Sequence, residues 1–104
     1  MKEFYKLVRD NIPDIIKQNN EEPITRILDD KEYLDQLNIK LTDEVKEYLD
    51  SGEIEELADI MEVILAIAKS KDVSYEQLEA IRKEKVLKRG AFDKKIFLEK
   101  TLNK

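Results

Sequence analysis

Two pairs of acidic side chains, each pair three residues apart, flank a short turn in this sequence. The first pair is Glu44 and Glu47 in "EVKE", and the second is Glu56 and Asp59 in "ELAD". The stretch that holds them, residues 43–59, contains eight acidic residues and a single lysine. Carboxylates crowded in this way favour hard divalent cations, and Mg²⁺ in particular combines protein carboxylates with water and phosphate oxygens.

The composition removes the other common catalytic and metal-binding groups. The chain has no Cys and no His, which excludes thiolate and imidazole metal sites and every histidine-dependent nucleophile. Any bound metal must therefore be held by oxygens, which favours Mg²⁺, Mn²⁺ or Ca²⁺. A net charge of −5 argues against nucleic acid as a partner. The N-terminus "MKEFYKLVRD" lacks the apolar run of a signal peptide, and the run "IMEVILAIA" is too short for a membrane span. We expect a soluble, cytoplasmic protein with no membrane partner.

The elements that position the acids are expected to be long helices, because the chain has only two Gly and two Pro. We predict a mainly α protein, an antiparallel helical bundle in a single domain over residues 1–104, with a short N-terminal two-stranded ribbon. Asp29 with Glu32 and Ser74 with Gln77 are spaced as capping boxes at helix starts. The expected helices cover residues 13–19, 29–49, 53–70 and 74–88, and the expected strands cover residues 4–8 and 24–27.

Helical spacing predicts that the acids lie where two helices pack. Glu44 falls at the edge of the apolar stripe of residues 29–49, and Glu56 falls inside the apolar arc of residues 53–70. A charge inside an apolar arc costs several kcal/mol unless a partner, a metal or a proton relieves it. The tight turn at residues 50–52 makes the two helices antiparallel neighbours, so the two acidic pairs are expected to form one four-carboxylate cluster.

The same acidic residues also suit simpler roles. Glu55 and Glu56 fit the first turn of a helix, where negative charge favours the dipole. The apolar arc is also what an oligomer interface needs, with Glu56 paired to a Lys or Arg. An acidic patch can equally meet a basic partner protein.

Three ordered segments resemble a known family. The stretches "YKLVRDNIPDII", "EELADIMEVI" and "RKEKVLKRGAF", together with the two acidic pairs, are similar to small MazG-like members of the all-α nucleoside triphosphate pyrophosphohydrolases, a superfamily that includes phosphoribosyl-ATP pyrophosphohydrolase. The resemblance spans about residues 4 to 92. It differs at Asp43, where many relatives have Glu, and we do not count Asp43 as a ligand.

The resemblance implies hydrolysis of a nucleoside triphosphate to a monophosphate and pyrophosphate, with Mg²⁺ as cofactor and Mn²⁺ as the alternative ion. The implied metal ligands are Glu44, Glu47, Glu56 and Asp59, of which Glu44 and Glu47 are also the implied catalytic residues. Cations must meet the triphosphate, and an aromatic ring can stack on the base. The substrate-binding candidates are Lys6, Arg9, Lys85, Lys88, Arg89 and Phe92. For these groups the plainer alternatives are surface salt bridges for the cations and a core position for Phe92.

The last expectation concerns the oligomeric state of the chain. The second long helix, residues 53–70, is apolar over well over half its circumference, more than one small chain can bury. We expect a homo-oligomer, and the resemblance implies a dimer or a tetramer. A non-catalytic helical module that binds nucleotide or a partner protein remains the alternative function.

Overall fold

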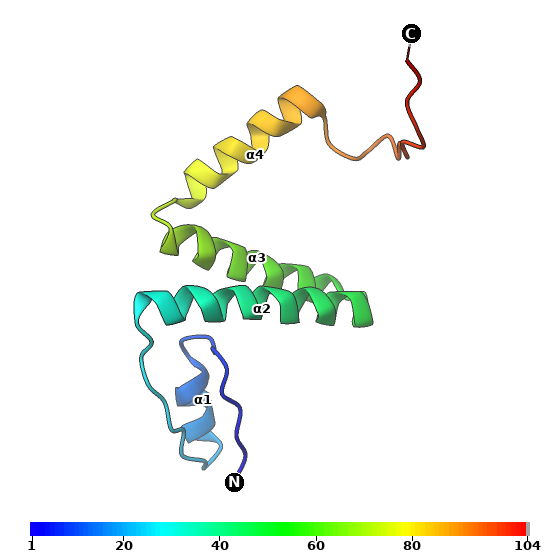
Figure 1. Ribbon diagram of the computed structural model, residues 1–104. Helices are drawn as coiled ribbons and strands as arrows, with labels where there is room; N and C mark the ends of the chain where they lie inside the picture. The colour runs from blue at the N-terminus through cyan, green and yellow to red at the C-terminus, as the bar shows by residue number, and fades with distance from the viewer. Residues whose placement is uncertain (104) are drawn as a thin grey trace.

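The computed structural model describes residues 1–103 and consists of four α-helices, α1 (Ile12–Gln18), α2 (Asp30–Ser51), α3 (Ile54–Ser70) and α4 (Tyr75–Arg89). The prediction of a mainly α protein is confirmed. In Figure 1, α2 and α3 lie side by side as an antiparallel hairpin, α1 lies beyond the other side of α2, and α4 leads away from α3. No helix within residues 1–103 combines the length and apolar character that crossing a membrane requires.

The expected two-stranded ribbon is wrong, because residues 1–103 contain no strand. The first segment, residues 4–8, includes Tyr5 with a positive φ of 45°, which interrupts an extended run. In the second, Ile24 and Ile27 are 92% and 95% exposed, so no apolar face is buried by pairing. Two isolated strands with neither a third strand nor a packed face are at best marginally stable in water.

The long helices begin at the predicted caps. The Asp29 side chain accepts a hydrogen bond from the Glu32 backbone N–H at 2.8 Å, while the Glu32 carboxylate pairs with Arg26 rather than completing the box. At the start of α4 the box is complete, since Ser74 and Gln77 each accept a hydrogen bond from the other's backbone N–H. Side-chain capping therefore fixes where α2 and α4 start.

The hairpin of α2 and α3 positions the acidic residues. Gly52 ends α2 with φ 69°, a left-handed conformation that glycine adopts without strain, and its N–H bonds the Tyr48 carbonyl at 2.7 Å. Only two residues separate the helices, so the chain reverses at once. Leu37 on α2 and Val63 on α3 are the most buried apolar side chains of the described chain, at 3% and 8% exposed.

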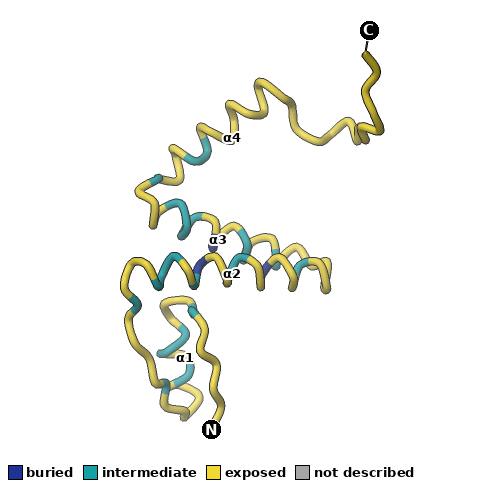
Figure 2. Tube along the Cα trace, in the orientation of Figure 1, coloured by how far each residue is buried: buried dark blue, intermediate teal, exposed yellow. Residues whose placement is uncertain are grey.

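The rest of the described chain packs much less. Figure 2 shows buried and half-buried positions concentrated along α2 and α3, whereas most of α4 and the segment after it are exposed. The radius of gyration is 18.7 Å, against about 13 Å for a compact domain of this length. Within one chain the predicted bundle is therefore a helical pair with extended flanks.

Candidate metal centre

Three of the four predicted acids converge across the hairpin. One carboxylate oxygen from each of Glu44, Glu56 and Asp59 lies within 4.8 Å of the other two. Glu44 comes from α2, two turns before Gly52, and the other two project from adjacent turns of α3. The short connection brings the end of α2 beside the start of α3, so residues on either side of the turn meet in space.

Glu44 is the buried member of the group and lacks a full set of partners. It is 8% exposed, the one charged residue that the described chain buries. Its Oε1 lies 3.6 Å from Lys40 Nζ, one helical turn earlier, but its Oε2 is buried without any hydrogen-bond partner. A buried acceptor without a donor costs free energy, and a coordinated cation would satisfy it.

The pKa of Glu44 is raised above its ordinary value. Burial is the main cause, because it disfavours the charged form, and the neighbouring Glu47 carboxylate raises the pKa further. Lys40 acts in the opposite direction and Asp59 adds a smaller increase. The surroundings of Glu44 thus disfavour its own negative charge, and a bound proton or a nearby cation would relieve this.

Asp59 already has a cationic partner. Arg9 Nη2, from the segment before α1, donates a hydrogen bond to Asp59 Oδ1 at 2.7 Å. Both side chains remain accessible, at 57% exposed for the arginine and 41% for the aspartate. The predicted phosphate-binding residue Arg9 is therefore placed directly at the acidic group.

Glu47, the fourth predicted acid, lies apart from the group of three. It is exposed on α2, and the three oxygens that lie within 4.8 Å of one another do not include one of its own. It is nevertheless near enough to Glu44 to raise the pKa of that residue. Glu47 thus lies at the rim of the group, in contact with solvent.

The other predicted substrate contacts do not gather at the acids. Lys6 Nζ lies 5.4 Å above the Phe4 ring, and Phe92 is 97% exposed rather than in the core. The remaining three cations line a hollow of about 230 Å³ on α4, with Ile81 and Glu84. These three are Lys85, Lys88 and Arg89.

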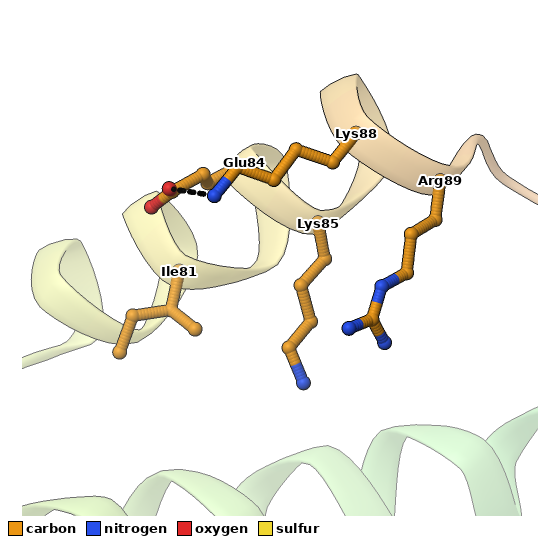
Figure 3. A pocket seen from close by; sticks show the side chains of 5 residues that line it. All are labelled: Ile81, Glu84, Lys85, Lys88 and Arg89. Atoms are coloured by element: carbon orange, nitrogen blue, oxygen red, sulfur yellow. Dashed lines mark ion pairs between the residues drawn. The ribbon is translucent and has the colours of Figure 1, made fainter.

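Two of the α4 cations point toward the hairpin. In Figure 3 the Lys85 and Arg89 side chains extend from α4 toward the helix below, which is α3 by its colour. Lys88 instead folds back along its own helix, where its Nζ pairs with Glu84 Oε1 at 2.9 Å. Among residues 1–103, no ion pair involves Lys85 or Arg89.

Lys40 is a residue of the centre that the sequence pattern did not single out. Its position four residues before Glu44, on the same face of α2, is the signal that would have identified it. An i, i+4 ion pair is usually a surface feature of little consequence, but here one partner is buried.

The donor set fits a hard divalent cation. All three converging groups are carboxylates, the ligands that Mg²⁺, Mn²⁺ and Ca²⁺ prefer, and the unpartnered Glu44 Oε2 provides a specific need for positive charge.

Comparisons of the chain with protein-family models, curated proteins and solved structures each gave no match.

Proposed function

We propose that this chain is a Mg²⁺-dependent nucleoside triphosphate pyrophosphohydrolase that clears surplus or non-canonical nucleotides, with Mn²⁺ as the alternative ion. The observation that carries the proposal is the convergence of Glu44, Glu56 and Asp59 around a buried carboxylate oxygen that has no donor. The similarity of the three ordered segments and two acidic pairs to the MazG-like family supports the same reaction.

The converging carboxylates would hold the ion, which supplies charge neutralisation on the phosphates as the reaction proceeds. Glu47, exposed at the rim beside Glu44, is available to accept a proton from a water molecule. The water oxygen bonds to the α-phosphorus as the bond from that phosphorus to the α–β bridging oxygen breaks. The bridging oxygen keeps the electron pair, so nucleoside monophosphate and pyrophosphate are the products.

The phosphates also need cations from the protein. Arg9 stands at the acidic group, and its guanidinium can form paired hydrogen bonds with phosphate oxygens. Lys85 and Arg89 extend from α4 toward α3, where further phosphate oxygens would meet them. The distribution of these cations over the N-terminal segment and α4 suits an elongated, highly charged substrate.

A homo-oligomer is part of the proposal. The chain exposes 10183 Å², against about 6100 Å² for a compact monomer of its mass. On α3 the side turned away from α2 carries an exposed apolar stripe at spacings i, i+3, i+7 and i+10, the pattern of a helix that packs against another helix. We name this set the outer stripe: Ile54, Leu57, Met61 and Ile64.

The outer stripe also favours the alternative function, a helical module that binds a nucleotide or a partner protein without turnover. Exposed apolar patches of this kind mark interaction sites in general and do not by themselves indicate catalysis. The two functions differ in what they require of the acids, because an interaction module has no need for a buried, unpartnered Glu44.

The test is a panel of ribo- and deoxyribonucleoside triphosphates incubated with the protein and Mg²⁺, with products separated by chromatography. We expect monophosphate and pyrophosphate, and a loss of about 10²- to 10³-fold in kcat for Glu56→Gln. Glu62→Gln is the matched control, because Glu62 is an exposed acid of the same helix outside the acidic group.

The pattern of products separates the hypotheses. Diphosphate plus inorganic phosphate would indicate a different reaction, and an equal loss in both variants would show that the acidic group is not the centre. No turnover, combined with no Mg²⁺-dependent nucleotide binding in calorimetry, would leave the interaction module.

A further inference from the structure

The ion pair between Arg9 and Asp59 is the one side-chain polar contact among residues 1–103 that joins positions far apart in the sequence. Every other side-chain hydrogen bond or ion pair in this part of the chain joins positions no more than six apart, whereas Arg9 and Asp59 are 50 apart. This contact connects the segment before α1 to the acidic group of the hairpin.

The ion pair between Arg9 and Asp59 involves a carboxylate of the candidate metal centre. Asp59 supplies one of the three converging carboxylates, and Arg9 Nη2 lies 2.7 Å from its Oδ1. The three carboxylates carry a formal charge of −3, and Arg9 and Lys40 together supply +2, which leaves −1. A divalent ion entering this group would meet a guanidinium at hydrogen-bond distance from one of its ligands, and like charges so close repel.

We propose that Arg9 is a built-in counter-cation of the metal-free acidic group, and that a divalent ion displaces it. The inference rests on the proposed metal centre and adds an exchange of one cation for another. The guanidinium can leave at little cost, because its side chain is 57% exposed and an exposed ion pair contributes little to stability.

Displacement has a consequence for the order of events. While Arg9 is paired with Asp59, one N–H donor of its Nη2 is committed to a carboxylate oxygen. Once the ion takes over that carboxylate, the guanidinium is free to bond phosphate oxygens beside the ion. The exchange therefore makes ion binding precede the full set of phosphate contacts, and Arg9 is a substrate-binding residue whose availability depends on the ion.

The test measures divalent-ion affinity in the absence of nucleotide. Mn²⁺ is titrated into the full chain and free Mn²⁺ is followed by electron paramagnetic resonance, for the wild type, Arg9→Met and Arg9→Lys. Removal of a competing ion pair is expected to tighten Mn²⁺ binding by about 1.5- to 5-fold in Arg9→Met, with a smaller change in Arg9→Lys.

Arg26→Met is the matched control. It removes the same charge and the same kind of exposed pair, with Glu32 at 2.9 Å, but at a place away from the acidic group. We expect its Mn²⁺ affinity to stay within experimental error of the wild type.

A second measurement follows Arg9 itself by NMR. Mg²⁺ is expected to shift the Arg9 Nε–Hε signal of the wild type and to lower the heteronuclear NOE of the backbone around Arg9, as the segment is released. Arg26 serves again as the internal reference, with an unchanged signal.

The outcomes separate this inference from the proposed function. Unchanged or weaker Mn²⁺ binding in Arg9→Met, or an Arg9 signal that Mg²⁺ does not move, would overturn the exchange while leaving hydrolysis intact. An exchange observed in a protein that hydrolyses no triphosphate would support the inference and refute the proposed function. Absence of divalent-ion binding without nucleotide would refute the exchange, and its absence with nucleotide as well would also refute the proposed function.

Discussion

The hairpin helices α2 and α3 together contain 19 apolar and 15 charged residues, whereas α4 contains 6 apolar and 8 charged residues, and the two regions pack differently. The hairpin buries Leu37 and Val63 between its helices and holds its acids in a defined group. On α4, Leu87 is 88% exposed and Ile81 is 51% exposed, and its polar contacts are local ion pairs and a cap. The difference shows that in this chain helix formation is directed by local signals, whereas a defined side-chain geometry requires a second helix alongside.

The largest expected effect is on folding stability. Leu37→Ala should lower the free energy of unfolding by about 2–5 kcal/mol, because it leaves a cavity at the most buried position of the hairpin. Leu87→Ala, the matched change on α4, should cost less than about 0.5 kcal/mol, since the side chain is exposed. Chemical denaturation of both variants is the measurement. A comparable loss in both would mean that α4 packs against another surface, and the contrast between the two regions would be broken.

The second effect is on association. Met61→Glu places a charge in the middle of the outer stripe and should weaken self-association by at least about 100-fold, because a charge buried without a partner is costly. Lys71→Glu introduces the same residue at an exposed position just after α3 and is the control. Light scattering coupled to size-exclusion chromatography reports the mass of each variant. A wild type that elutes as a monomer at every concentration would exclude the outer stripe as an interface between copies.

The smallest effect is on the pH dependence of stability. The pKa of Glu44 is raised in the folded state, mainly by burial, so the folded chain binds a proton more tightly than the unfolded chain does. Stability from this group is therefore greatest at low pH and falls as pH rises from the unfolded pKa through the raised folded value. Without divalent ions, Glu44→Gln should be about 1 kcal/mol more stable than the wild type at neutral pH.

Melting temperatures across a pH series, with and without Mg²⁺, check this dependence. Mg²⁺ should stabilise the wild type at neutral pH and leave Glu44→Gln nearly unchanged, because the variant lacks the buried ligand. Asp43→Asn changes the adjacent, exposed acid and should retain the response to Mg²⁺. A wild type that does not lose stability relative to Glu44→Gln as the pH rises over this range would contradict the assignment of Glu44 as a destabilised carboxylate.

The sequence was sufficient for the elements whose causes are local. Caps at Asp29 and Ser74 and the glycine at position 52 specify ends of α2 and α4 through bonds to nearby backbone. The starts of α1 and α3 have no side-chain cap, but Pro13 in the first turn of α1 and the apolar periodicity of α3 are also local signals, so all four helices could be predicted to within a few residues. The ribbon could not, because strand pairing depends on partners distant in sequence, and residues 4–8 and 24–27 find none in the structure.

The same division applies to the candidate site. Helical spacing and the short turn between the two helices were enough to predict that Glu44, Glu56 and Asp59 lie close together. The exposed rim position of Glu47 and the reach of Arg9 to Asp59 depend on side-chain conformations and on the path of the N-terminal segment, for which no periodic signal exists. Spacing identifies the face of a helix, but it does not identify which side chains on that face touch.

The two-residue connection between α2 and α3 has a further consequence for how the protein acquires its centre. All three converging carboxylates lie within sixteen consecutive residues, from Glu44 to Asp59, so closing one very short loop is enough to bring them together. Contacts of such low sequence separation form early and fast during folding, ahead of any long-range docking. The nascent hairpin is therefore expected to attract divalent ions before the termini have found their final positions.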